Sequence, residues 1–256
     1  MNEQVRQFFR TEGESHFNQV QLLSEEKGLQ WEQIQKTGIS RAWFELSQLS
    51  VEDRIHFTSE FWLSRLPFHP IATPQIEEFF HELDDVVVAL TRQTNEEPWR
   101  AELVYSLADN SCFFRGLVPA NEKEIQEIQR RLSVHLPRDF LAFLHLHDGF
   151  GKLTELGLFP LKELEENRRR IINKVLLAEK PMDPYQLYPF YEDFGLEAFQ
   201  CFHGDWYPGS EMGNVYFSGI DYTVSDVKER TCWAEQSAYP TFLEWLGDFL
   251  QGLICT

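Results

Sequence analysis

The chain has 256 residues, of which 43% are hydrophobic and 14% aromatic, so it can form one large domain or two modest ones with an ample core. Its 41 acidic residues against 23 lysines and arginines give a net charge of −18, which argues against nucleic acid or an anionic membrane as a partner because both require a basic surface. No apolar run approaches the roughly 20 residues that span a bilayer, and the N-terminus lacks the apolar core of a signal peptide, so we expect a cytoplasmic protein.

Residues 1 to about 70 are predicted to be helical. Ser50 is a good N-cap for a helix with Asp53 in its first turn, and Pro67 ends that helix. Apolar residues recur at helical spacing in three groups, namely Val5, Phe8 and Phe9, then Phe17, Val20 and Leu23, then Ile55, Phe61, Trp62, Leu63 and Leu66. We interpret this part as a small helical bundle or helical layer whose aromatic residues form a core.

A further helix follows the proline-rich stretch 67–74, with Ile76, Phe79, Phe80 and Leu83 on one side. The period then changes, and three segments rich in β-branched and aromatic residues predict an antiparallel meander: Val86 to Thr91, Trp99 to Leu107 and Ser111 to Val118. The sequence leaves open whether this meander forms a separate sheet or extends the sheet of the second half. We place a domain boundary at residue 120, between a helical extension with a β-meander (1–120) and a second domain (121–256).

The second half begins with two helix signals in a row. Asn121 is a good N-cap and Glu124 can reach back to its backbone N–H, which predicts a helix with Ile125, Ile128 and Leu132 on one face. The pair Leu136-Pro137 breaks this helix and starts another. The second helix has Phe140, Phe143 and Leu144 on its apolar face, ends at Asp148-Gly149, and precedes a short buried extended segment, 156–161.

This order of helix, LP corner, helix, glycine stop and strand resembles the SUKH superfamily, which includes fungal cell-wall synthesis regulators and many bacterial immunity proteins. Gly213-Asn214 before an aromatic strand and a helix from Tyr239 to Leu253 also match it, so the resemblance covers residues 121–256. It implies an α+β fold with a mixed or antiparallel sheet flanked by helices, and a role in recognising another protein. The matching motifs are structural, so they say more about fold than about activity.

Downstream, residues 161–177 predict a helix in which Arg168, Arg169 and Arg170 form a salt-bridged face. The segment 180–189 contains three prolines and is interpreted as an irregular loop. Strands are predicted at 196–202, 215–217, 223–227 and 231–234, and a C-terminal helix with Phe242, Trp245, Leu246, Phe249 and Leu250 on one face is predicted to pack on the sheet.

The sequence contains no catalytic or cofactor motif. Gly149-Phe150-Gly151-Lys152 lacks the spacing of a phosphate-binding loop, and no nucleophile elbow follows Gly209-Ser210. The four cysteines, Cys112, Cys201, Cys232 and Cys255, form no C-x-x-C pair. Cys201, His203 and Asp205 alternate along a predicted strand, but scattered residues of these types usually have structural roles. We therefore expect no cofactor and no metal.

The aromatic and acidic loop 201–214 is the most suggestive surface. Trp206 and Tyr207 are rigid anchors of the kind that dominate interfaces, and Asp205 and Glu211 supply charge. Residues 192–248 carry 11 acids against Lys228 and Arg230. The candidate partner-binding residues are Asp205, Trp206, Tyr207, Glu211, Asp221 and Asp226. In the alternative interpretation, Trp206 folds back onto the sheet and the acids only keep the protein in solution.

These features favour a non-enzymatic binding protein. In bacteria the resemblance implies immunity, in which the protein covers a cognate toxin, often a basic nuclease, and the acidic region would complement such a partner. The long segment 1–120 departs from the family, which supports a second hypothesis of a regulatory adaptor with one partner on each half. A metal-dependent enzyme is the third hypothesis.

Overall fold

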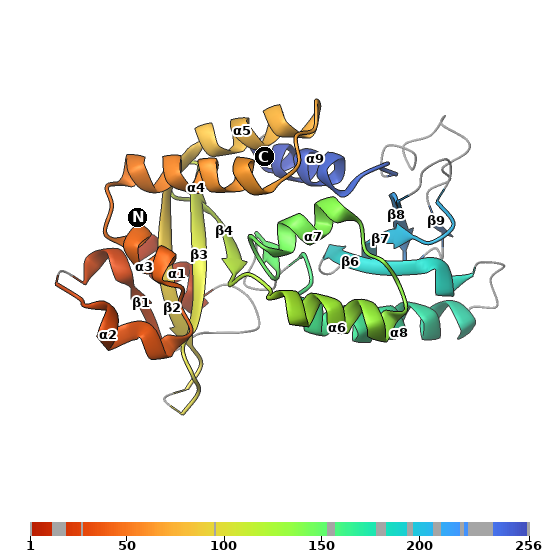
Figure 1. The fold of residues 1–256 in the computed structure, drawn as a ribbon, viewed down its shortest axis with the longest axis horizontal. Helices are drawn as coiled ribbons and strands as arrows, with labels where there is room; N and C mark the ends of the chain where they lie inside the picture. Colours follow the sequence, from red (N-terminus) through yellow and green to blue (C-terminus); the bar gives the residue numbers. More distant parts are fainter. Residues whose placement is uncertain are drawn as a thin grey trace.

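The computed structural model shows an α+β fold in which both sheets are antiparallel (Figure 1). The structure describes residues 2–11, 19–26, 28–94, 96–152, 157–177, 183–193, 197–206, 211–220, 223–224 and 238–254. The helices of these ranges are α1 (Asn2–Thr11), α2 (Trp31–Ile34), α3 (Arg41–Ser47), α4 (Val51–Arg65), α5 (Ala72–His81), α6 (Glu122–Leu132), α7 (Arg138–Leu144), α8 (Leu161–Leu177) and α9 (Phe242–Ile254), with 3-10 turns at Leu23–Glu25, Gln35–Thr37 and Pro184–Gln186.

The strands form a five-stranded sheet in the order β1-β2-β3-β4-β5 and a four-stranded sheet in the order β6-β7-β8-β9. Their bounds are β1 (Gln19–Leu22), β2 (Leu83–Arg92), β3 (Arg100–Leu107), β4 (Cys112–Leu117), β5 (Phe150–Gly151), β6 (Leu187–Asp193), β7 (Ala198–His203), β8 (Asn214–Ser218) and β9 (Thr223–Val224). Leu158 makes β-bridges to Phe150 on one side and to Tyr191 on the other. The predicted meander therefore does not stand apart, since β4 pairs with β5 and Leu158 connects β5 to β6.

Two predictions of irregular or helical structure are wrong. Residues 19–22, predicted to be helical, form β1 because they pair with β2 in antiparallel register, from Gln19 opposite Arg92 to Leu22 opposite Ala89. Residues 187–189, predicted as loop, are the start of β6, where a bulge follows Pro189. In both places strand pairing outweighs the local pattern, with distant β2 as the partner of β1 and the next strand, β7, as the partner of β6.

Helix α4 begins as predicted, since the Ser50 hydroxyl accepts a hydrogen bond from the backbone N–H of Asp53. Its buried residues are Arg54, Thr58 and Trp62. The prediction that Phe61 lies in the core is wrong, because its side chain is 41% exposed. The side of α4 that faces the core is therefore marked by Trp62 and by the buried Arg54. The apolar pattern of the sequence did not indicate that an arginine would be buried.

The predicted capping box and the two apolar faces of the second half are confirmed. The Asn121 side chain accepts from the Glu124 N–H at 3.0 Å, and the Glu124 carboxylate accepts from the Asn121 N–H at 2.9 Å. The apolar residues of α6 and α7 are buried. Helix α7 ends at Leu144, four residues before the predicted stop, and Gly149 takes a positive φ of 104° in the turn that leads into β5.

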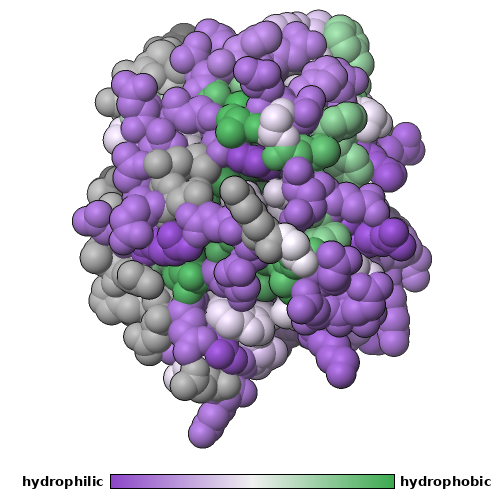
Figure 2. Space-filling model, turned by 90° about the vertical axis from the view of Figure 1, so that its left-hand side faces the viewer, coloured by the Kyte–Doolittle hydropathy of each residue, from purple (hydrophilic) through white to green (hydrophobic). Residues whose placement is uncertain are grey.

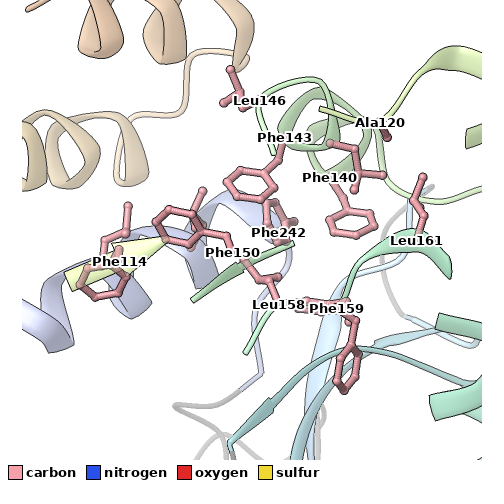
Figure 3. Close-up of a cluster of buried hydrophobic side chains, with 14 of the residues drawn as sticks. Phe114, Ala120, Phe140, Phe143, Leu146, Phe150, Leu158, Phe159, Leu161 and Phe242 are labelled. Atoms are coloured by element: carbon pink, nitrogen blue, oxygen red, sulfur yellow. The ribbon is translucent and has the colours of Figure 1, made fainter. Parts of the chain in front are cut away.

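Aromatic side chains from both halves of the chain meet in one core (Figure 3). Phe143 of α7 lies 5.4 Å from Phe242 of α9 between ring centroids, and Phe114 of β4 stacks on Phe150 at 5.6 Å. Helix α9 also packs along α5, where a side chain on Gly247 would collide with Gln75. The main hydrophobic cluster therefore includes residues from both sides of position 120.

The four-stranded sheet is covered by α8, whose predicted bounds of 161 and 177 are confirmed. The predicted salt-bridged arginine face of α8 is confirmed for Arg169, bound to Glu165, and for Arg170, bound to Glu192 of β6 at 2.9 Å. Arg168 instead donates to the Tyr185 carbonyl at 2.8 Å and lies over the Tyr188 ring. The strand predicted at 231–234 lies outside the described residues, and the strand predicted from 223 is described only at 223–224.

Candidate protein-binding surface

The connection between β7 and β8 carries three of the predicted binding residues, Asp205, Trp206 and Glu211. The two strands pair from Ala198 opposite Ser218 to Phe202 opposite Asn214. At the base of the connection, the His203 N–H donates to the Gly213 carbonyl at 3.0 Å and the Trp206 N–H donates to the His203 carbonyl at 3.1 Å. These hydrogen bonds fix the direction in which the chain leaves β7.

Trp206 is half-buried and packs against the main hydrophobic cluster. Its indole ring lies against the backbone of Gly213, where an added Cβ would come within 2.2 Å of ring atom Cε2. A side chain at position 213 would therefore displace the ring, which packs against this glycine with part of its surface accessible. A ring ordered before binding loses less conformational entropy in an interface.

Glu211 lies across from the start of α7. Its carboxylate is 3.1 Å from the Arg138 guanidinium and also accepts from the Arg138 backbone N–H at 3.3 Å. Arg138 is 89% exposed and Glu211 45% exposed, so the pair is a surface ion pair worth at most about 1 kcal/mol. A partner that pairs with the Glu211 carboxylate in place of Arg138 would therefore lose little free energy by breaking this ion pair.

Asp205 is exposed beside His203. Burial lowers the pKa of His203, and the negative charge of Asp205 acts in the opposite direction. The structure thus brings Asp205, Trp206 and Glu211 onto one connection. Tyr207, Asp221 and Asp226 lie outside the described residues, so their part in the surface stays a prediction.

Of the residues considered for metal binding, Cys201 is buried whereas Asp205 is exposed. The Cys201 thiol is fully buried, which raises its pKa. His145 faces Glu122 at 3.8 Å, whereas the His147 ring is buried. In the part of the chain that the structure describes, no group of three or more His, Cys, Asp or Glu side chains is placed to hold a metal ion.

A buried hydrogen-bond chain was missed by the sequence reasoning. The Trp62 indole N–H donates to the Tyr105 hydroxyl at 3.2 Å, and the Tyr105 hydroxyl lies 2.6 Å from His147 Nε2. His147 Nδ1 lies 2.8 Å from the carbonyl of Leu117. Because a carbonyl only accepts, Nδ1 carries the hydrogen and Nε2 accepts from Tyr105. Burial lowers the pKa of His147 to about 4, so the ring is neutral at pH 7.

Two aspartates of the 121–160 motif also act internally. Asp139 accepts from the backbone N–H of Leu243 at 3.0 Å, at the start of α9, and Asp148 accepts from that of Leu161 at 2.7 Å, at the start of α8. Burial raises the pKa of both carboxyls, that of Asp148 to about 6. Their contacts explain these two aspartates by helix capping.

The comparisons with known proteins concern the same half of the chain. The model of the SMI1 / KNR4 family (SUKH-1) matches residues 119–248, which is just over half of the 256 residues. No curated protein matches the chain. The matched range contains α6, α7, α8 and the whole β7–β8 connection. No helix among the described residues is long and apolar enough to cross a membrane.

Proposed function

The chain belongs to the SMI1 / KNR4 family (SUKH-1), and from this membership we propose that it is a non-enzymatic module that binds another protein in the cytoplasm. Membership of this family fits a protein-binding or immunity-type module. The packing motif of residues 121–160 supports this function, because Glu124, Asp139 and Asp148 there are engaged in helix capping.

The observation that carries the proposal is the β7–β8 connection. It presents the ring of Trp206, which packs against Gly213, together with exposed Asp205 and the carboxylate of Glu211. Interfaces combine rigid aromatic anchors with charged groups that select the partner and speed association. A partner with a basic surface fits this connection, and a basic toxin covered in the manner of an immunity complex is the specific partner that we propose.

The test is affinity capture from the native host with the full chain, followed by binding measurements with the captured protein in purified form. The variant Asp205→Lys reverses one exposed charge at the surface, and Glu32→Lys makes the same charge change on exposed Glu32 of α2. The first variant should weaken binding about ten-fold or more, equivalent to about 1.4 kcal/mol, and the second should not. Binding should weaken as salt rises.

Equal binding by the two variants, or binding that is indifferent to salt, would refute this surface as the site. Capture of a basic toxin whose activity the chain abolishes would establish the immunity function. Capture of two proteins that bind at the same time would instead establish the second proposal, a regulatory adaptor. That alternative is favoured by the first half of the chain, which adds strands β1 to β4 and the helices that precede and cover them to the family match.

A further inference from the structure

Helix α4 exposes large apolar side chains on its outer face. Phe57 is 53% exposed and Phe61 is 41% exposed, one helical turn further along. Phe68 and Ile71, in the connection from α4 to α5, are 79% and 56% exposed. Figure 1 shows α4 running along the outside of the molecule. We refer to these four residues as the α4 face.

The α4 face cannot turn inward, because the buried side of the helix is locked. The Arg54 guanidinium donates to both carboxylate oxygens of Asp85 at 2.7 Å, and its Nε donates to the Val86 carbonyl at 2.7 Å. Roughly two helical turns further along, Trp62 is buried and donates to Tyr105. Rotating the helix to bury Phe57 would expose Trp62 and separate a buried ion pair, so the exposure of the face is built into the fold.

The charge around the α4 face is negative. At 100° per residue, Asp53 and Glu60 lie within about 60° of Phe57 around the helix, and both are exposed. Residues 50–84 contain seven acids against two bases, Arg54 and Arg65. Arg54 is buried against Asp85, which leaves Arg65, whose guanidinium carbon lies 5.3 Å from the centroid of the Phe61 ring.

The face of the molecule on the left-hand side of Figure 1 differs from the α4 face in how its apolar residues are distributed. Figure 2 shows a mostly hydrophilic face on which hydrophobic atoms form small areas separated by hydrophilic ones. Scattered apolar residues of that kind are ordinary, whereas aromatic side chains on successive turns of one straight helix form a continuous ridge. Such a ridge matches the apolar face of a second helix packed along it.

We propose that the α4 face docks an amphipathic helix of another protein, with apolar residues that cover Phe57 and Phe61 and with lysines or arginines facing Asp53 and Glu60. A second copy of this chain fits less well, since a symmetric pair would place the Asp53 and Glu60 rows of two copies against each other. This docking site lies on the first half of the chain, outside the family match, and does not depend on the β7–β8 surface.

The test uses a fluorescent helical peptide of about 18 residues, roughly five turns, with leucines on one face and lysines elsewhere. A second peptide has the same composition in an order that gives no apolar face. The full chain should bind the first peptide about ten-fold or more tightly than the second, because only the first has an apolar face that can cover Phe57 and Phe61. The double variant Phe57→Ser/Phe61→Ser should lose this preference and keep the melting temperature, since both side chains are already exposed.

The control is Leu176→Ser, which removes a 55% exposed apolar side chain on α8 and should leave the preference unchanged. Equal binding of the two peptides, or an unchanged preference in the double variant, would overturn the proposal. Sedimentation of the wild-type chain as a concentration-dependent dimer that the double variant abolishes would also overturn it, in favour of a second copy as the occupant. None of these outcomes bears on Asp205, so failure here is separable from failure of the β7–β8 surface.

Discussion

Replacing His147 by glutamine should make the folded protein less sensitive to acid. The imidazole is 1% exposed, its neighbours Tyr105 and the Leu117 carbonyl are uncharged, and burial holds its pKa at about 4 instead of the ordinary 6.5. The unfolded chain therefore binds a proton near pH 6.5, whereas the folded protein does not bind it until about pH 4. Stability from this residue is complete above pH 6.5 and declines as the pH falls toward 4.

The size of this decline follows from the interval between the two pKa values. At about 1.4 kcal/mol per pH unit, His147 should remove about 3 kcal/mol of unfolding free energy between pH 7.5 and pH 4. Glutamine can donate to the Leu117 carbonyl and accept from Tyr105 without taking up a proton. His147→Gln should be less stable than the wild type at pH 7.5, yet its stability should fall by about 3 kcal/mol less on acidification.

The measurement is urea unfolding of the full chain, wild type and variant, at several pH values between 7.5 and 4. Asp148 acts with the opposite sign, because its raised folded pKa makes protonation favour the folded state as the pH falls through about 6. That contribution is present in both proteins and cancels in their difference. His135→Gln, at an exposed histidine, should follow the wild type. If the unfolding free energies of the wild type and of His147→Gln fell by the same amount between pH 7.5 and pH 4, the reasoning would be refuted.

Three further predictions concern stability and the division of the chain. Asp85→Ala should cost about 3 to 5 kcal/mol in urea unfolding, because it leaves the Arg54 guanidinium buried without its counter-charge, and a cost below about 1 kcal/mol would contradict this. Asn121→Ala should cost about 1 kcal/mol by loss of the helix cap, and an unchanged unfolding midpoint would argue against it. A fragment of residues 121–256 should bind a hydrophobic dye and melt below the full chain, because α9 loses the helix α5 on which it packs. A fragment as stable as the full chain would instead support independent domains on either side of residue 120.

Local signals were reliable where each element depends on its own residues. The Asn121 capping box, the apolar faces of α6 and α7, the bounds of α8 and the three strands of the meander were all predicted from neighbours within a few positions. Glycines and a proline likewise placed Asp205, Trp206 and Glu211 on a connection between strands. Propensity, capping and hydrophobic period act over one or two turns, so a single sequence contains them.

The errors occur where a distant partner decides the outcome. Residues 19–22 become a strand because β2 offers an edge, and α4 buries Arg54 because it pairs with Asp85, 31 positions away. The contact of Glu211 with Arg138 spans 73 positions, and nothing near either residue indicates it.

The sequence by itself determined the family, the class of fold and the order of most elements. Only the tertiary structure decided that the meander joins the sheet of the second half, that His147 is buried beside Tyr105 and that α4 presents phenylalanines to solvent. These features depend on which surfaces meet after collapse, and side chains far apart in the chain acquire their burial, charge partners and pKa values at that step.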